Sequence, residues 1–315
     1  MGDFYRRLGK AELHVHLEGS LEPGTLCELD PDLNVEAVRS RYQYNSFQDF
    51  IETYKWVIDR LRGPAAYALA TRRLLERLAA ENVRYAEINL SAGIILHRGM
   101  DLASIYDAVV REAARSPVEV WWIFDAVRDF GPEHAMEVAR LAAERAADRV
   151  VAFGIGGDEN RGPAEWFRET FQYARDQGLH VTAHAGETAG PESVRAALAA
   201  GAERIGHGIR AAEDPELLRL LRERDIALEI CLTSNAAIGA VGSLTGHPVR
   251  RIFDAGVPIV LNTDDPAMFH TTLSGEYELA ARRFGFTRSE LEALARNSFR
   301  YAFRAAASPI ERVTT

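Results

Sequence analysis

Short apolar runs alternate along this chain with longer segments of helical periodicity. Eight runs rich in β-branched and aromatic residues predict strands, at residues 11–16, 83–90, 117–126, 150–156, 179–185, 204–207, 226–232 and 257–263. Most of the segments between them are rich in Ala, Leu, Arg and Glu at helical spacing, as at 66–80, 135–147, 191–200 and 214–224. Eight strands alternating with helices predict a (β/α)8 TIM barrel of the α/β class.

The first connection of the predicted barrel, residues 17–82, is much longer than a single helix requires. Its segment 46–62 carries four side chains at the spacing of one apolar helix face, Phe47, Phe50, Ile51 and Tyr54. This spacing predicts an extra helical lid segment after strand 1. No linker, low-complexity tract or repeat interrupts the chain, so we expect residues 1–315 to form a single domain.

Composition narrows the possible function classes. The chain has 315 residues, of which 47% are hydrophobic and 26% charged, and its net charge is −9. An acidic chain without a Lys- and Arg-rich run is a poor partner for phosphates. We therefore expect a small-molecule substrate and no nucleic acid.

Cysteine usage and hydropathy bear on the compartment. The two cysteines, Cys27 and Cys231, form no disulfide framework, which favours a cytoplasmic protein. The N-terminus lacks the apolar core of a secretory signal, and no apolar run approaches the roughly 20 residues of a membrane helix. We expect no membrane partner.

Two histidines stand at the end of the first predicted strand, in the sequence His14-Val15-His16. Because side chains alternate along a strand, His14 and His16 point the same way, and in a barrel that direction can be the axis near the catalytic mouth. Two imidazoles on one face can chelate one metal ion. Taken alone, this pattern is more often a partly exposed strand than a metal site.

Polar groups recur at the ends of four further predicted strands. They form the segments Gly156-Gly157-Asp158-Glu159, His184-Ala185-Gly186-Glu187, Gly206-His207-Gly208 and Asn262-Thr263-Asp264-Asp265-Pro266. The carboxyl ends of barrel strands meet at one face, where catalytic groups collect. Imidazoles and carboxylates at the same end of separate strands predict a metal-dependent active site.

The residue types divide into metal ligands and groups that transfer protons. A catalytic zinc ion takes about three protein ligands and a water, and occasionally a fifth ligand. We expect one such ion to be bound by His14, His16, His184 and Asp264. His207 is the candidate base beside the activated water, and Glu187 is placed to donate a proton as a neutral acid. Asp265 is free for a ring nitrogen of the substrate.

Five motifs follow one another along the chain: Glu12–Gly19 (ELHVHLEG), Gly156–Glu159 (GGDE), His184–Glu187 (HAGE), Arg204–Gly208 (RIGHG) and Asn262–Pro266 (NTDDP). In this order, and spanning nearly the whole chain, they resemble the adenosine and adenine deaminase family of the amidohydrolase superfamily. The resemblance implies one zinc ion per chain. It also implies hydrolytic deamination at C6 of an adenine-type ring, with a small purine nucleoside as substrate.

The resemblance implies roles for individual residues. Zinc is bound by His14, His16, His184 and Asp264. His207 activates and orients the zinc-bound water, and Glu187 protonates the ring nitrogen beside the attacked carbon. Asp265 hydrogen-bonds the imidazole side of the purine, and the backbone at Gly157 approaches another ring nitrogen. Hydroxide attacks C6 and ammonia leaves, an arrangement in which preorganised charges do much of the catalysis.

Three alternatives fit the residues less well. Cytidine-deaminase-type sites need a Pro-Cys-x-x-Cys element, which this sequence lacks. Many other amidohydrolases use two metals bridged by a modified lysine, and the strand-4 end at 156–159 offers no lysine. A catalytically silent metal- or purine-binding protein on the same scaffold would lack a ligand or the acid, and all of them are present here.

Glu18 bears most on the choice of substrate. Adenosine deaminases carry aspartate at the matching position, where it hydrogen-bonds the ribose hydroxyl region, and adenine deaminases resemble this chain in carrying glutamate. The segment 156–159 instead resembles the nucleoside deaminases. An adenosine modified at its 5′ position, such as 6-aminodeoxyfutalosine, reconciles the two. Adenosine and free adenine remain the alternatives.

The lid segment completes the predicted site. The family uses this region as an apolar gate over the ligand, so Phe50, Ile51 and Tyr54 are candidates for substrate contact, although core packing explains the same spacing. Such a lid would exclude water around the acid and the metal. Surface or structural roles are expected for the remaining histidines, His97, His134, His180, His247 and His270. Thr233-Ser234-Asn235, after strand 7, is expected only to support the site.

Overall fold

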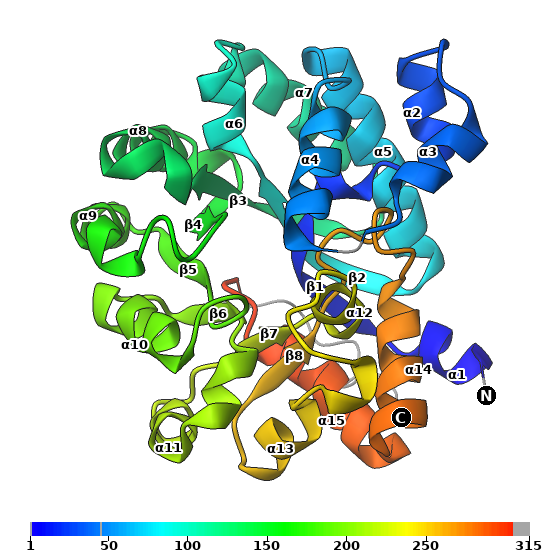
Figure 1. Cartoon of the computed structure of the whole chain (residues 1–315). Coiled ribbons are helices and arrows are strands. Elements are labelled where there is room, and N and C mark those ends of the chain that lie inside the picture. The colour runs from blue at the N-terminus through cyan, green and yellow to red at the C-terminus, as the bar shows by residue number, and fades with distance from the viewer. Residues whose placement is uncertain (1, 45, 305–315) are drawn as a thin grey trace, which may run out of the picture.

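The computed structural model describes residues 2–44 and 46–304, and it confirms the predicted barrel. Eight parallel strands pair in chain order: β1 (Lys10–His16), β2 (Val83–Leu90), β3 (Glu119–Val127), β4 (Val150–Gly156), β5 (His180–Ala185), β6 (Arg204–His207), β7 (Leu228–Ile230) and β8 (Ile259–Leu261). Figure 1 looks along the barrel, with the strands as a central ring and helices outside it. Just beyond β8, Asp264 pairs with Val15 of β1, which brings the last strand end back to the first.

All eight predicted strands are present, and their lengths differ from expectation mainly at the end of the chain. β7 and β8 pair over only three residues each, although their apolar runs extend over 226–232 and 257–263. Strands of a parallel sheet are buried on both faces, so apolar character continues past the last ladder hydrogen bond. Hydropathy therefore locates these strands without marking where pairing stops.

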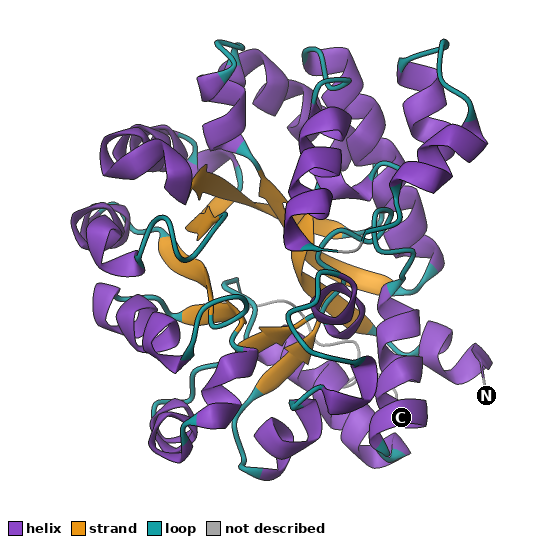
Figure 2. Ribbon diagram, in the orientation of Figure 1, coloured by secondary structure: helices purple, strands orange, loops and turns teal. Residues whose placement is uncertain are grey.

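The α-helices that surround the sheet are shown in Figure 2. In chain order they are α1 (Gly2–Arg7), α2 (Pro23–Leu29), α3 (Val35–Arg41), α4 (Phe47–Ile58), α5 (Pro64–Ala80), α6 (Ala92–His97), α7 (Leu102–Ala113), α8 (Gly131–Glu144), α9 (Arg168–Asp176), α10 (Pro191–Ala200), α11 (Pro215–Glu223), α12 (Leu232–Ala237), α13 (Val249–Asp254), α14 (Leu273–Phe284) and α15 (Arg288–Arg300). The four helical segments predicted between strands correspond to α5, α8, α10 and α11, and the lid segment is α4. Among the described residues, no helix is both long and apolar enough to cross a bilayer.

Local sequence explains where these helices begin. Pro215 occupies the first turn of α11, where its missing N–H leaves no hydrogen bond unmade. The Asp214 side chain caps the same helix by accepting from the N–H groups of Glu216 and Leu217, both at 3.0 Å. At α15, Thr287 and its third following residue form a capping box.

The end of the barrel where the strands begin is closed by the segment after α15. The Phe303 N–H donates to Glu87 Oε1 at 2.6 Å, and the Arg204 guanidinium lies 3.8 Å from the centroid of the Phe303 ring. The Tyr301 carbonyl accepts from Arg204 Nη1 at 2.8 Å, and His180 stacks on Phe303 at 4.5 Å. This floor covers the end of the barrel opposite to the one where the strands finish.

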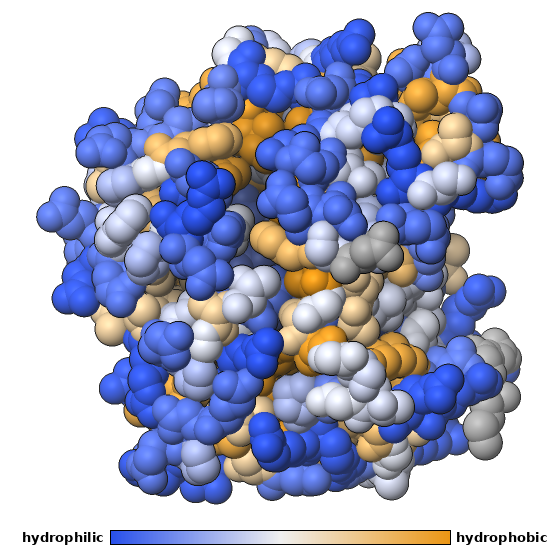
Figure 3. Space-filling view, viewed as in Figure 1, coloured by the Kyte–Doolittle hydropathy of each residue, from blue (hydrophilic) through white to orange (hydrophobic). Residues whose placement is uncertain are grey.

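Helix α4 forms an aromatic cover at the end where the strands finish. Phe50 stacks on Phe269 with ring centroids 4.9 Å apart, and Tyr44 contacts both rings. Near the end of the helix, the guanidinium groups of Arg41 and Arg60 lie 4.6 Å and 3.9 Å from the centroid of the Trp56 ring. On this face of the molecule, apolar side chains gather near the centre within a largely polar surround (Figure 3).

Candidate metal centre and active site

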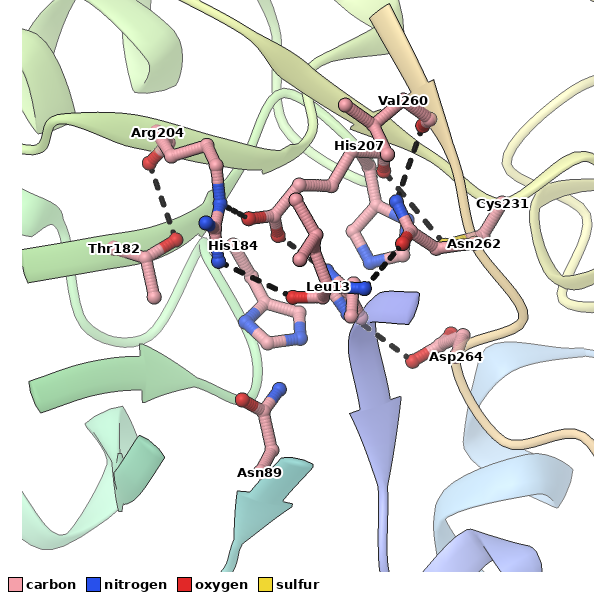
Figure 4. Close-up of polar contacts among 12 residues, drawn as sticks. Leu13, Asn89, Thr182, His184, Arg204, His207, Cys231, Val260, Asn262 and Asp264 are labelled. Atoms are coloured by element: carbon pink, nitrogen blue, oxygen red, sulfur yellow. Dashed lines mark hydrogen bonds and ion pairs between the residues drawn. The ribbon is translucent and has the colours of Figure 1, made fainter. Parts of the chain in front are cut away.

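The side chains predicted to form the site come from the carboxyl ends of separate strands. His14 and His16 lie at the end of β1, His184 is in β5, His207 ends β6, and Asp264 follows β8. In a parallel barrel these ends share one rim, so residues far apart in sequence become neighbours. Figure 4 shows the side chains of His184, His207 and Asp264 converging from three parts of this rim.

The atoms available to a metal ion lie close together. His14 Nε2 and His16 Nε2 are 3.3 Å and 3.4 Å from Asp264 Oδ1. His16 Nε2 is 3.1 Å from His184 Nε2. Ligands at tetrahedral positions on bonds of about 2.0–2.1 Å are about 3.3–3.4 Å apart. The spacing therefore fits one small divalent cation.

Hydrogen bonds on the outer side of two rings leave their inner nitrogens free to bind a metal. His14 Nδ1 lies 2.7 Å from Glu229 Oε2, and His184 Nδ1 lies 3.1 Å from the Ile155 carbonyl oxygen. Ionised carboxylate and carbonyl oxygens only accept, so Nδ1 carries the proton and Nε2 keeps a lone pair.

The arrangement of the lone pairs supports the presence of a cation. His16 Nε2 lies 3.1 Å from His184 Nε2, and the Asn89 amide nitrogen approaches the same His16 atom at 3.4 Å. Among the described residues, buried His14 Nε2 has no hydrogen-bond partner. A metal ion among the three nitrogens would satisfy all of them.

His207 also approaches the cluster. One atom each of His207, His14, His184 and Asp264 lies within 4.8 Å of the others, so distance alone does not exclude His207 as a ligand. Burial lowers the pKa of His207 to about 4, which leaves the ring neutral near pH 7. His207 and Asp264 both have left-handed backbone angles (φ 62° and 63°). Such conformations cost of order 1 kcal/mol in non-glycine residues and cluster at functional sites.

Glu229 connects His14, a candidate ligand, to the barrel floor. Its Oε2 accepts from His14 Nδ1, and its Oε1 accepts from Arg204 Nε. Arg204 also donates to Glu87 Oε2 at 2.6 Å and to the Leu13 carbonyl at 3.2 Å, the latter visible in Figure 4. Burial opposes ionisation of Glu229, but Arg204 and His14 outweigh it and lower its pKa to about 2. A buried, ionised carboxylate thus aims His14 into the site.

Asp264 is positioned by a hydroxyl group. Ser234 Oγ donates to Asp264 Oδ2 at 2.6 Å, which leaves Oδ1 toward His14 and His16. Burial opposes the charge on Asp264, but the imidazoles of His14, His207 and His16 beside it hold the pKa well below the usual range. An ionised Asp264 is a suitable oxygen ligand for a divalent cation.

Glu187 lies on the turn after β5 and is held from two sides. Asn235 Nδ2 donates to Glu187 Oε1 at 2.8 Å. The Glu159 carboxylate accepts from the backbone N–H groups of Gly186 and Glu187 at 2.7 Å and 2.9 Å. Burial, reinforced by the charge of Asp264, raises the pKa of Glu187 well above its usual value. A raised pKa favours the protonated carboxyl group, which is the form that can act as a proton donor.

Glu18 and Asp265 provide unpartnered oxygens beside the metal centre. A side chain at Gly19 would overlap the Asp265 carboxyl group, so the segment after β1 packs directly against Asp265. Glu18 Oε1 accepts from the Ser91 N–H at 3.1 Å. Glu18 Oε2 and Asp265 Oδ1 are buried with no hydrogen-bond partner among the described residues. Because buried polar atoms are nearly always paired, these two oxygens are available to a ligand.

The predicted lid residues approach this region to different degrees. The Tyr54 hydroxyl lies 3.2 Å from Ser91 Oγ, so Tyr54 and Glu18 share a partner at the end of β2. Phe50 is buried against Phe269, whereas Ile51 is only partly buried. The structure therefore brings Tyr54 nearest to the carboxylates of the site.

Gly157 lies against the end of β3. Its φ of 95° favours glycine, and a Cβ there would lie 3.3 Å from side-chain atoms of both Val127 and Asp129. The preceding Gly156 packs against the His184 ring. Gly157 is exposed at the rim, where its backbone is open to a ligand.

Several residues of the site were not singled out from the sequence. Glu229 and Asp125 are charged residues within otherwise apolar strands, which is the signal that could have revealed them. Glu159 belongs to a recognised motif, but only the structure shows that it accepts from the turn bearing Glu187. Asn235 was expected merely to support the site, yet it contacts both Glu187 and His207.

Comparison with known proteins agrees with this geometry. The sequence profile of the family described as adenosine deaminase matches residues 9–310. The chain belongs to the adenosine deaminase family. Family membership makes it a hydrolase of the deaminase type, and the grouping of His14, His184, His207 and Asp264, with His16 alongside, forms a candidate metal site.

Relatives within the adenosine deaminase family differ in substrate. The chain is 41% identical to the aminodeoxyfutalosine deaminase of Streptomyces avermitilis, with 96% of this chain and 89% of that protein covered. It is 37% identical to an adenine deaminase of Rhizobium leguminosarum bv. trifolii, with 94% and 95% covered. The crystal structure of an adenine deaminase from Arthrobacter aurescens has a TM-score of 0.88 and 30% identity, with 96% and 95% covered.

Proposed function

We propose that this protein is a zinc-dependent deaminase that replaces the 6-amino group of an adenine nucleoside with oxygen and releases ammonia. The observation that carries the proposal is the juxtaposition of a candidate divalent-metal ligand set with the buried carboxyl group of Glu187, whose pKa is raised by burial. His14, His16 and His184 each direct Nε2 toward the site, and Asp264 adds an oxygen. When bound there, zinc supplies Lewis-acid activation of a water molecule.

The remaining residues of the site account for the protons and the orientation of the ring. Glu187 donates a proton to N1 of the purine, which reduces the aromatic resistance of C6 to attack. His207 orients the attacking water. Asp265 hydrogen-bonds the imidazole side of the purine, and the backbone at Gly157 approaches another ring nitrogen. The water oxygen adds to C6, which becomes tetrahedral. Of the two water protons, one goes to N6, so that the C6–N6 bond breaks and ammonia leaves, and the other replaces the proton that Glu187 gave to N1.

We propose an adenosine modified at the 5′ position as the substrate, with 6-aminodeoxyfutalosine as the first choice. Glu18 supports this choice because its buried Oε2 has no partner within residues 2–44 and 46–304, so it can accept a hydrogen bond from a sugar hydroxyl. A relative of 41% identity is an aminodeoxyfutalosine deaminase. Phe50, Ile51 and Tyr54 would cover the nucleoside and exclude bulk water.

Free adenine is the second candidate, favoured by the adenine deaminases of 37% identity and by the glutamate at position 18. Purified protein loaded with zinc should be assayed for ammonia release with adenine, adenosine, 5′-deoxyadenosine and 6-aminodeoxyfutalosine. We expect the highest kcat/KM for 6-aminodeoxyfutalosine. A preference for adenine would reject the nucleoside assignment, and no ammonia from any of the four would reject deamination of adenine compounds.

Glu18→Asp provides a matched test of the substrate assignment. The shorter carboxylate draws its oxygens back by one methylene, so the hydrogen bond to the sugar region lengthens. We expect kcat/KM for 6-aminodeoxyfutalosine to fall relative to adenosine, while the value for adenine changes little. An equal change for all three compounds would mean that Glu18 does not contact the sugar region.

A further inference from the structure

A chain of hydrogen bonds runs from the start of α13 to two residues of the active site. The Val249 backbone N–H donates to His247 Nδ1 at 3.1 Å. A backbone N–H can only donate, so His247 Nδ1 must carry a lone pair. Burial lowers the pKa of His247 to about 4, and the neutral ring then has its single proton on Nε2.

The proton on His247 fixes the orientation of Asn235. His247 Nε2 lies 3.2 Å from Asn235 Oδ1, and this contact is a hydrogen bond because the nitrogen donates and the amide oxygen accepts. The Asn235 NH2 group is therefore on the other side, 2.8 Å from Glu187 Oε1 and 3.0 Å from His207 Nδ1. Both amide hydrogens of Asn235 are therefore used. We call this chain of hydrogen bonds the relay; its members, Val249, His247, Asn235, His207 and Glu187, are all buried.

We propose that His247 and Asn235 are positioning residues that hold His207 with its proton on Nε2, so that His207 faces the attacking water as a hydrogen-bond donor. The inference rests on the function proposed above. His207 Nδ1 receives a hydrogen from Asn235, so it must keep its lone pair. Glu187 Oε1 lies farther from Nδ1, at 3.3 Å, and already accepts from Asn235, so a proton on Nδ1 would be directed against the nearer Asn235 NH2 group. The neutral ring therefore presents N–H, rather than a lone pair, through Nε2.

This assignment separates His207 from the metal ligands. His14 and His184 each have an acceptor oxygen at Nδ1 and so present an Nε2 lone pair. His207 has a donor at Nδ1 and presents Nε2–H, which cannot coordinate a cation. The opposite hydrogen-bond environment thus explains why His207, although within 4.8 Å of three potential ligands, stays available for the water.

The relay also directs the proton of the acid. Asn235 donates to Glu187 Oε1, so the proton of the neutral carboxyl group belongs on Oε2, the oxygen left for the substrate. In the other tautomer, His207 would carry its proton on Nδ1 and a lone pair on Nε2. The Asn235 amide would then have to rotate by 180° so that its oxygen accepts from His207. That rotation would place the Asn235 NH2 group against the Nε2–H of His247 and leave a buried donor unpaired, which costs about 1–3 kcal/mol. The inference therefore replaces the base role expected for His207 with a donor role.

The tautomer can be measured directly in the resting protein. Long-range 1H–15N correlation spectra of zinc-loaded, full-length protein with 15N-labelled histidine distinguish protonated from unprotonated ring nitrogens. The chain has nine histidines, and a His207→Gln variant identifies the signals of His207 by their loss. We expect protonated Nε2 at His207 and protonated Nδ1 at His14 and His184. A protonated Nδ1 at His207 would overturn the proposal, whatever the substrate assays show.

Variants of the relay test its direction. Asn235→Asp replaces the donating NH2 with an oxygen, so the proton of His207 should move to Nδ1. His247→Leu removes the donor that fixes Asn235, and we expect mixed tautomers at His207 and a fall in kcat of roughly 10- to 100-fold, as for other groups that orient catalytic residues. His247→Gln can still donate to Asn235 and accept from Val249, so it should restore a single tautomer and most of the lost activity.

Metal content and circular dichroism of each variant identify any that fail to fold, and the wild-type spectrum decides the tautomer without them. Equal losses in His247→Leu and His247→Gln, with the His207 signals unchanged in both, would contradict the relay and leave His247 a packing role. Loss of ammonia release with every substrate would reject the proposed function, but it would not alter the spectrum of the resting protein. The two failures are therefore distinguishable.

Discussion

Replacing Glu229 with Gln tests how the buried network beneath the metal centre controls a ligand. Both carboxylate oxygens of Glu229 accept hydrogen bonds, one from Arg204 and one from His14. Gln has one accepting oxygen and one donating NH2 group. Arg204 stays protonated in proteins, so the Gln oxygen should turn toward Arg204 and the NH2 group toward His14. His14 can then pair only by accepting at Nδ1, which moves its own proton to Nε2.

The expected cost follows from that change of tautomer. With a proton on Nε2, His14 has no lone pair for the metal. To bind the metal, His14 must carry its proton on Nδ1 instead, where that proton is directed against the NH2 group of the introduced Gln. The charge-assisted hydrogen bond from His14 to Glu229, worth roughly 1.5–3 kcal/mol, is then lost in the metal-bound state. At about 1.4 kcal/mol for each factor of ten, zinc affinity should fall by roughly 10- to 100-fold.

Zinc affinity can be measured by competition with a chelator of known affinity, independently of catalysis. Glu87→Gln is the matched control, because Glu87 binds the same Arg204 from the other side and is equally buried, whereas the Nδ1 nitrogen of His14 faces Glu229. We expect Glu87→Gln to lower the unfolding free energy while keeping zinc affinity close to that of the wild type. Unchanged affinity in Glu229→Gln, or the same loss in both variants, would refute the reasoning.

Three further predictions follow from the structure. Glu187→Gln removes the acidic proton, so kcat should fall by roughly 10²- to 10⁴-fold with zinc content unchanged, and near-normal turnover would remove the acid role. Phe50→Ala opens the stack on Phe269, so it should raise KM and lower the unfolding free energy by about 3 kcal/mol in denaturant titrations. Trp166→Ala, at a side chain that is 57% exposed, should change neither KM nor the unfolding free energy. Equal changes of KM in the two variants would contradict a lid role for Phe50. Burial lowers the pKa of Lys10 to about 8, against about 10.4 in an unfolded chain, so between these pH values the unfolded chain binds more protons and stability rises with pH. The unfolding free energy of the wild type relative to Lys10→Met should therefore increase from about pH 8 to pH 10, and a flat difference would argue against the shifted pKa.

The fold was largely predictable because the strands and helices of a barrel have different hydrophobic patterns in the sequence. All eight strands were located, including 204–207, whose only apolar side chain is Ile205. The lid helix was also predicted, because Phe47, Phe50, Ile51 and Tyr54 recur at helical spacing and Ser46 caps the first turn. The ends of β7 and β8 were not predicted, since burial continues where pairing has stopped.

The sequence by itself also determined which residues meet. Parallel strands bring their carboxyl ends to one rim, so His14, His16, His184, His207 and Asp264 had to become neighbours once the barrel was accepted. Family motifs added expected roles. Neither argument specified the surroundings of each ring, because those depend on residues elsewhere in the chain.

Only the tertiary structure decided which nitrogen each histidine presents to the site. Glu229 is 215 positions from His14 in the sequence, and Asn235 is 28 positions from His207, yet these two contacts set opposite protonation patterns on the two rings. No local pattern encodes such pairings, because a hydrogen bond depends on where a donor and an acceptor lie after folding. The sequence determined that imidazoles and carboxylates would gather, and the folded barrel decided which donor or acceptor lies against each ring.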